Sequence, residues 1–169
     1  NAAAARILDR LGVTLVAAPE AGCCGAVSYH LGAHEEGLDY MRRNIDAWWP
    51  AIEDGAEAIL ISASGCGAMV KDYEHLLAED PDYAEKAKRV TALAQDVGEI
   101  IAKEDLSRLD LKATDRRIAL HTPCTLLHGM GLPDTVRSVL TEAEFALCET
   151  SEDHLCCGSA GTYSILQPK

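Results

Sequence analysis

The chain carries the tripeptide Cys-Cys-Gly twice, and vicinal cysteines have a definite chemistry. The two copies are Cys23-Cys24-Gly25 and Cys156-Cys157-Gly158. Thiolates on neighbouring residues can bind one inorganic centre, and thiolate is the ligand of iron–sulfur clusters and of many zinc sites. Because the pair recurs after a predicted strand and before a predicted helix, the sequence predicts parts of two related metal-binding modules.

Two further cysteines have spacings that fit such modules. Cys66 lies in Ser64-Gly65-Cys66-Gly67, with 41 residues between it and Cys24, and Cys124 follows Thr122-Pro123, with 31 residues between it and Cys156. If each complete module has the order Cys, Cys-Cys-Gly, Cys, the first module lacks its opening cysteine and the second its closing one. We therefore expect two separate, interrupted sites and not four ligands of one cluster.

The remaining candidate side chains have simpler interpretations. The chain has 7 cysteines, and an odd count with no secretory segment favours a reducing cytosol over a disulfide framework. Cys148, in the apolar stretch 145–148, is predicted to be a buried thiol on a strand. His121, His128 and His154 lie near cysteines, where a structural role is favoured over a hydrogen bond to a cluster.

The elements that must position these residues alternate between strand and helix. Helices are predicted over 1–11, 38–49 (ended by Pro50), 69–77, 81–109 and 133–140, and strands over 13–18, 57–62, 118–121 and 144–148. This order predicts an α/β fold in which helices flank a parallel sheet. Ligands gather beyond the carboxyl ends of such strands, where the cysteines lie.

Charge and organisation limit the function classes. The formal net charge is −12, which argues against binding to nucleic acid and against direct adhesion to anionic lipid. No run of about 18 apolar residues predicts a membrane span. Residues 1–110 are assigned to a first module lacking its start and 111–169 to a second lacking its end, so we expect a fragment truncated at both ends.

Five separated blocks carry a family resemblance that covers nearly the whole chain, at 21–31, 44–53, 63–67, 121–126 and 151–163. These blocks resemble the iron–sulfur subunits of glycolate oxidase (glycolate dehydrogenase). More broadly the chain resembles the cysteine-rich CCG superfamily, which includes the heterodisulfide reductase B subunit. It has no counterpart of the ferredoxin-like region of such subunits.

The resemblance implies an electron-relay role in an oxidoreductase complex, with no catalytic residue in this chain. Flavin-containing subunits would oxidise glycolate, and the iron–sulfur subunit would pass electrons toward a quinone-linked acceptor. The implied location is cytoplasmic, or peripheral at the inner face of the cytoplasmic membrane through the complex. The implied [4Fe-4S] cluster ligands, grouped by module, are Cys23, Cys24 and Cys66, then Cys124, Cys156 and Cys157. We expect the isolated chain to carry no cluster, or zinc.

Two other functions compete with this one. A thiol–disulfide enzyme like heterodisulfide reductase is the first, but Met69 stands where the superfamily often has the second cysteine of Cys-x-x-Cys. That departure puts a non-cubane cluster in doubt. The second is an assembly module whose cysteines hold zinc or nothing. Glycolate, lactate and other 2-hydroxy acids are not distinguished as substrates of the complex.

Overall fold

The computed structural model describes residues 2–112, 115–151, 155–158 and 161–167. It contains short strands separated by helices, as the hydrophobic pattern predicts. The helices are α1 (Ala2–Leu11), α2 (Ala26–His30), α3 (His34–Glu53), α4 (Ser64–Lys71), α5 (Tyr73–Leu76), α6 (Ala84–Leu93), α7 (Val97–Ile101), η1 (Leu106–Arg108), η2 (Thr125–Gly129), α8 (Thr135–Glu142) and α9 (Tyr163–Leu166). The strands are β1 (Ile59–Ile61), β2 (Ala94–Asp96), β3 (Arg117–Ala119) and β4 (Ala146–Cys148).

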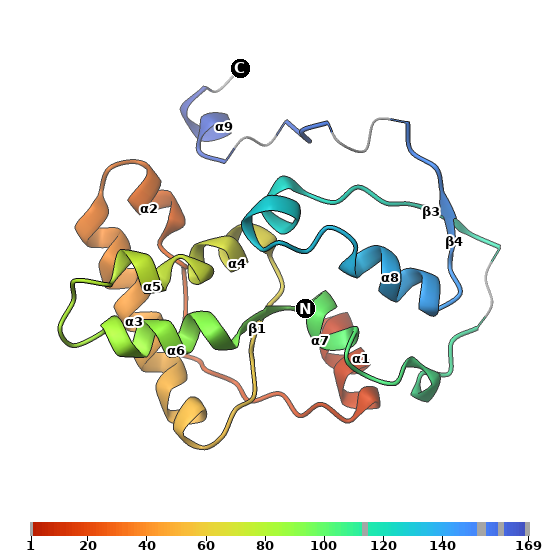
Figure 1. Cartoon of the computed structure of the whole chain (residues 1–169), viewed down its shortest axis with the longest axis horizontal. Helices are drawn as coiled ribbons and strands as arrows, with labels where there is room; N and C mark the ends of the chain where they lie inside the picture. The colour runs from red at the N-terminus through yellow and green to blue at the C-terminus, as the bar shows by residue number, and fades with distance from the viewer. Residues whose placement is uncertain (1, 113–114, 152–154, 159–160, 168–169) are drawn as a thin grey trace.

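The strands pair as two small parallel sheets. In the first, β1 pairs with β2 so that Ile59 lies opposite Ala94. In the second, β3 pairs with β4 so that Ala119 lies opposite Cys148. The predicted α/β class with parallel strands and flanking helices is confirmed. The sheet is divided in two, and each predicted module contains one pair of strands (Figure 1).

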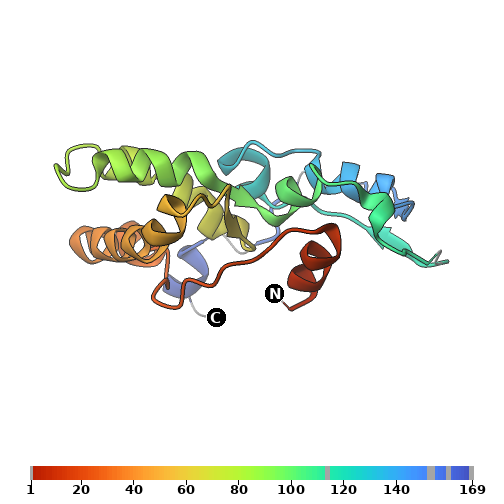
Figure 2. The same cartoon turned by 90° about the horizontal axis from the view of Figure 1, so that it is seen from below.

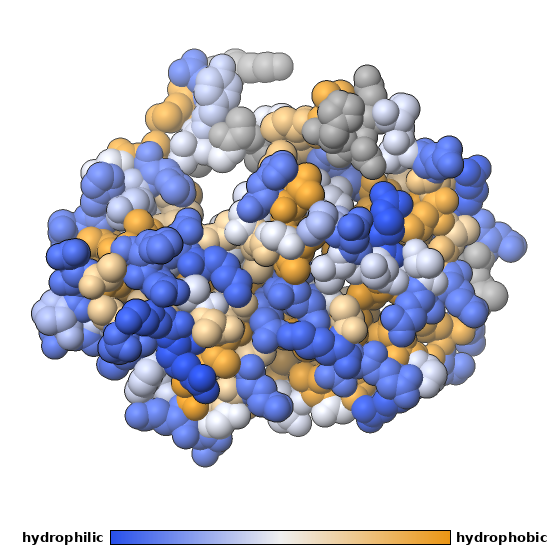
Figure 3. Space-filling model, in the orientation of Figure 1, coloured by the Kyte–Doolittle hydropathy of each residue, from blue (hydrophilic) through white to orange (hydrophobic). Residues whose placement is uncertain are grey.

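The hydrophobic core belongs almost entirely to the first half of the chain. Met41 and Ile45 of α3, Tyr73 of α5 and Val90 of α6 are each 0% exposed. Figure 2 shows α6 in a layer above α2 and α3. The four side chains belong to one cluster of buried residues. From residue 111 onward, Leu126 is the one hydrophobic side chain buried in the described part of the chain. Figure 3 accordingly shows hydrophobic surface at several places over the half that carries α8, β3 and β4.

Two predicted strand and helix assignments are wrong because tertiary pairing overrides local pattern. Residues 13–18 are extended but form no strand, since no described strand runs beside them, and Val16 is 72% exposed. The predicted long helix over 81–109 is interrupted by β2, whose Ala-Gln-Asp sequence has no β-branched residue. Asp96 ends β2 and caps α7, accepting a hydrogen bond from the Gly98 N–H at 2.7 Å.

Two predicted helix boundaries are also displaced. Helix α3 continues through Pro50 to Glu53, because a proline in the last turn removes one N–H donor without ending the helix. The predicted loop around Cys66 is instead the beginning of α4, so Cys66 lies in the first helical turn. This second difference bears on chemistry, because it places the Cys66 side chain at the beginning of a helix and not in a loop.

Candidate metal centre

Cys24 and Cys66 meet in one cavity of the first half. The cavity measures about 210 Å³ and is lined by both cysteines together with side chains of α3, β1 and α4, among them Asn44, Trp48 and Val70. Cys24 is 8% exposed, whereas Cys23 and Cys66 are exposed. The structure therefore brings two of the three predicted ligands of this module to the same space, from positions 42 residues apart in the chain.

The electrostatics of this cavity disfavour a free thiolate at Cys24. The pKa of the Cys24 thiol is raised to about 11, chiefly by burial and in smaller part by the Cys66 thiol, which is hydrogen-bonded to it. The Ala26 N–H, which donates to the Cys24 sulfur, acts in the opposite direction. Without a cation the Cys24 thiol therefore keeps its proton at neutral pH. A bound metal would remove that penalty, because metal binding and thiol deprotonation are coupled.

The loop that presents Cys23 and Cys24 has a backbone only glycine accommodates. Gly25 has φ +86°, and a Cβ at this position would lie 2.6 Å from the carbonyl oxygen of Gly37. Gly158, after the second pair, has the same left-handed conformation with φ +83°. The two Cys-Cys-Gly copies thus share a backbone feature as well as a sequence, which supports the interpretation of a repeat.

Asn44 and Tyr73 are hydrogen-bonded to the backbone of the same loop. The sequence pattern assigned no role to either residue. Asn44 is 1% exposed and Tyr73 is 0% exposed. The Asn44 amide contacts the backbone of Gly22 and Cys23, and the Tyr73 hydroxyl donates to the Cys24 carbonyl at 2.9 Å. The one signal in the sequence was an asparagine on the buried face of α3, between Met41 and Trp48 at helical spacing.

The second half places its cysteines on three different segments. Cys124 precedes η2 directly, Cys148 ends β4, and the pair at 156–157 lies in the loop beyond β4. The His121 ring nitrogen Nε2 lies 2.8 Å from the Leu155 carbonyl oxygen, so the segment leading to Cys124 is tied to the loop that carries the pair. This contact with a backbone carbonyl is of the structural kind that the sequence predicts for His121. His154 lies outside the described residues.

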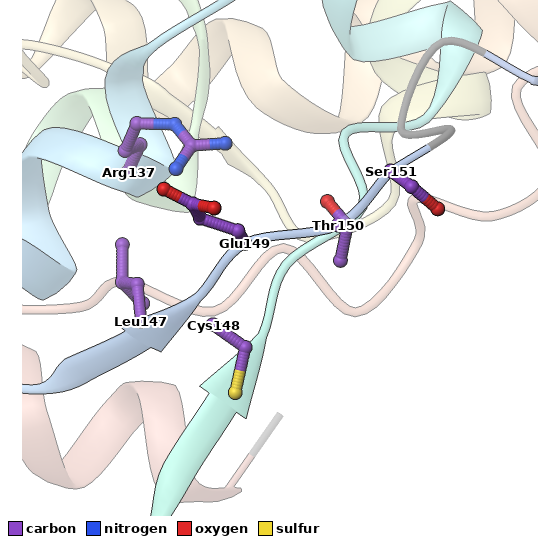
Figure 4. Close-up of a pocket in the computed structure, with 6 residues that line it drawn as sticks. All are labelled: Arg137, Leu147, Cys148, Glu149, Thr150 and Ser151. Carbon is purple, nitrogen blue, oxygen red and sulfur yellow. The ribbon is translucent and has the colours of Figure 1, made fainter.

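Cys148 is separate from the predicted ligands. Its side chain is half-buried and lines a cavity of about 550 Å³ with Arg137, Leu147, Glu149, Thr150 and Ser151. Figure 4 shows the Arg137 and Glu149 side chains on one side of the strand, while the Cys148 sulfur points to the other, toward β3. The prediction of a thiol on a strand is confirmed in position, although its burial is partial.

The two cysteine-bearing helical turns of the different halves pack on each other. The Ser64 and Thr125 hydroxyl oxygens are 2.7 Å apart, which joins the beginning of α4 to η2. A Cβ at Gly129 would lie 2.8 Å from the Cβ of Ala68, and one at Gly67 would meet the Met130 sulfur. Cys66 follows β1 by five residues and Cys124 follows β3 by five, so equivalent strand-to-helix junctions meet at this contact.

The donors fit a thiophilic metal or an iron–sulfur cluster only in part. Two thiols, those of Cys24 and Cys66, line one cavity, and thiolates are ligands of zinc, of iron and of iron–sulfur clusters. Across residues 2–112, 115–151, 155–158 and 161–167, however, no three His, Cys, Asp or Glu side chains are close enough together to hold a metal ion. Within these same ranges no helix is long and apolar enough to cross a membrane.

Known proteins are similar to the chain along nearly its full length. It is 54% identical over 168 residues to the glycolate oxidase iron-sulfur subunit of Escherichia coli (strain K12), covering 99% of this chain and 41% of that protein. It is 31% identical over 171 residues to the probable glycolate oxidase iron-sulfur subunit of Bacillus subtilis (strain 168), covering 99% of this chain and 37% of that protein. The chain thus spans about two fifths of the length of these relatives.

A more distant relative is covered over a larger share of its own length. The lactate utilization protein A of Anoxybacillus flavithermus is 29% identical over 169 residues, covering 96% of this chain and 67% of that protein. The family model of the cysteine-rich CCG domain matches residues 1–71 and 118–169. Each matched stretch holds one Cys-Cys-Gly pair with its left-handed glycine and one single cysteine at a strand-to-helix junction. With sequence and local geometry in agreement, the chain belongs to the cysteine-rich CCG domain family.

Proposed function

We propose that this chain is the CCG region of an iron–sulfur electron-transfer subunit in a glycolate or other 2-hydroxy acid dehydrogenase complex. The observation that carries the proposal is the shared cavity of Cys24 and Cys66, together with 54% identity to a glycolate oxidase iron-sulfur subunit. Flavin-containing subunits would oxidise the hydroxy acid, and a quinone-linked acceptor would take the electrons. The complex would reside in the cytoplasm, peripheral to the membrane at most.

The proposed ligands form two sets. Cys23, Cys24 and Cys66 belong to the first and Cys124, Cys156 and Cys157 to the second, and the proposed modules are residues 1–110 and 111–169. The pairing of β1 with β2 and of β3 with β4 within these ranges supports this division.

A bound cluster, proposed as [4Fe-4S], would supply one-electron storage, and the protein residues would determine how it is held. Cys66 would bind from the first turn of α4, where the helix N-terminus favours negative charge. The N–H groups of Ala26 and Gly158 already donate to cysteine sulfurs, the second to Cys156 at 3.4 Å. Such N–H···S contacts stabilise electron-rich sulfur and are a means of tuning reduction potential.

Met69 argues against the disulfide-reductase alternative. It occupies the position of the second cysteine in a Cys-x-x-Cys element, and it is 2% exposed within the core of the first half. The Met69 side chain packs in the hydrophobic core at this position, and its thioether supplies no thiolate to the site. The relay function therefore accounts for the cysteine set better than direct reaction with a substrate disulfide.

Metal analysis on protein purified anaerobically as part of its complex tests the proposal, since the isolated chain is expected to carry no cluster, or zinc. We expect iron and acid-labile sulfide, and an EPR signal that appears or disappears on reduction with dithionite. Cys24→Ser and Cys66→Ser should each lower the iron content, whereas Cys148→Ser, the matched control, should retain it. Stoichiometric zinc without iron or sulfide would overturn the cluster assignment in favour of the assembly module. Glycolate-dependent dye reduction by the whole complex, compared with lactate, tests the substrate.

A further inference from the structure

A buried polar pair contacts the first Cys-Cys-Gly loop at three consecutive residues. The Gly22 N–H donates to Asn44 Oδ1 at 2.8 Å, and Asn44 Nδ2 donates to the Cys23 carbonyl at 2.9 Å. The Tyr73 hydroxyl donates to the Cys24 carbonyl at 2.9 Å and accepts from Asn44 Nδ2 at 3.2 Å. Helices α3 and α5 thus meet the loop through one connected network.

This network holds the loop firmly because both of its side chains are buried. An amide or hydroxyl removed from water loses stability unless every donor and acceptor is paired. Here the Asn44 oxygen, the Asn44 nitrogen and the Tyr73 hydroxyl all have partners, and the backbone partners lie in the loop. Any shift of the loop would leave buried polar atoms unpaired, so the network selects one loop conformation.

We propose that Asn44 and Tyr73 are positioning residues of the first metal site, a proposal that rests on the function proposed above. They hold the backbone of Cys23 and Cys24 so that the Cys24 thiol stays in the cavity that Cys66 also lines. Neither side chain is a ligand. The contacts with the loop backbone explain why these two buried positions are polar.

Two variants and two controls test the proposal on the full chain. Tyr73→Phe removes one hydroxyl, and Asn44→Ala removes the whole amide. Tyr83→Phe deletes a hydroxyl that donates to the Asp46 carboxylate at 2.7 Å, and Ile45→Val trims a core side chain adjacent to Asn44 in sequence. The readouts are the alkylation rate of Cys24 in the metal-free chain and the thiolate-to-cobalt charge-transfer absorption on titration with Co²⁺, with melting temperature measured throughout.

The expected results separate positioning from general stability. Loss of one hydrogen bond corresponds to about a fivefold change, so Tyr73→Phe should speed Cys24 alkylation and weaken Co²⁺ binding by about that factor. Asn44→Ala should change both by about tenfold or more. Ile45→Val should lower the melting temperature without changing either readout, and Tyr83→Phe should change neither.

Two outcomes distinguish failure of this proposal from failure of the function. Unchanged alkylation and Co²⁺ titration in Tyr73→Phe, equal to those of Ile45→Val, would overturn the positioning role. If the unaltered chain gives no cobalt–thiolate absorption, the metal function fails, and the alkylation rates still decide whether the network holds the loop. If Asn44→Ala does not fold, Tyr73→Phe alone decides.

Discussion

At the residue scale, the raised pKa of Cys24 keeps its thiol protonated in the metal-free chain. Burial raises its pKa to about 11 from an ordinary value of 9.0. At pH 7.5 the thiolate fraction is then about a hundredfold lower than for an ordinary thiol, since each pH unit is a factor of ten. A metal ion that binds Cys24, as proposed, must displace this proton, so metal uptake should release protons.

The pKa of Cys24 predicts slow alkylation of the metal-free chain. Peptide mapping by mass spectrometry should show iodoacetamide reacting with Cys24 about a hundredfold more slowly than with a cysteine in an unfolded peptide at pH 7.5. The rate should rise about tenfold per pH unit up to pH 10. Because the folded-state pKa is raised, the stability contributed by the neutral thiol is present below pH 9.0 and is lost as the pH rises toward 11. Alkylation of Cys24 at the peptide rate would contradict this.

Gly25 provides a second residue-scale prediction. Gly25→Ala should lower the free energy of unfolding through two effects. A left-handed φ costs a residue with a Cβ about 1–2 kcal/mol, and the new methyl group would clash with the Gly37 carbonyl oxygen. Gly32→Ala is the matched control, with φ +89° and no atom within 4 Å of the place its methyl group would take. Urea denaturation should show a larger loss for Gly25→Ala. Equal losses would mean that α2 and α3 can separate at no cost.

At the element scale, small residues determine how α4 meets η2. Gly129→Ala should destabilise the chain more than Gly67→Ala, because Ala68 Cβ is fixed to its backbone whereas the end of the Met130 side chain can move. Gly65→Ala, with nothing within 4 Å, should stabilise α4 by up to about 1 kcal/mol through helix propensity. Thermal unfolding of the three variants checks this order. A neutral Gly129→Ala would show that the two halves do not depend on this contact.

For individual elements, the sequence pattern predicted those that depend on burial or amphipathicity within one segment. The apolar run Ile59–Ile61 and the periodic α8 were predicted because burial and amphipathicity are visible in sequence. Strand β2 was missed because it forms through its pairing with β1, whereas its own composition does not favour a strand. Residues 13–18 have strand composition without a partner, which is the reverse case. Both errors come from pairing between distant segments.

The candidate site shows the same contrast between what a local pattern predicts and what depends on contacts between distant segments. The chemistry of a thiol is evident from its residue type, so six cysteines were predicted as ligands, and the meeting of Cys24 with Cys66 agrees with the first set. Asn44 and Tyr73 were missed because their function depends on which backbone groups lie opposite them, 21 and 49 residues away. Contacts of this kind, between buried side chains and the backbone of the proposed ligands, become visible only when the tertiary structure is known.

At the scale of the whole molecule, the two halves differ in how much core they have. Ile59 and Ala94 of the first sheet are 8% and 0% exposed, whereas Arg117 and Ala146 of the second sheet are exposed. Amide hydrogen exchange should therefore be slower in β1 and β2 than in β3 and β4, because opening the second half uncovers little apolar surface. Uniform protection of both sheets, measured by mass spectrometry, would show that the molecule opens only as one unit.

The same asymmetry predicts that the two proposed metal sites load independently. Cys24→Ser removes a proposed ligand in the well-packed half. Cys157→Ser removes a proposed ligand in the loop beyond β4, which is joined to β3 through the contact of His121 with Leu155. Within the assembled complex, each variant should lose about half of the iron bound by this chain, and the double variant nearly all of it, because separate sites contribute additively. Cys148→Ser should retain the full content. If either single variant abolished all iron, both Cys-Cys-Gly pairs would have to serve one cluster, and the division of ligands between two modules would be wrong.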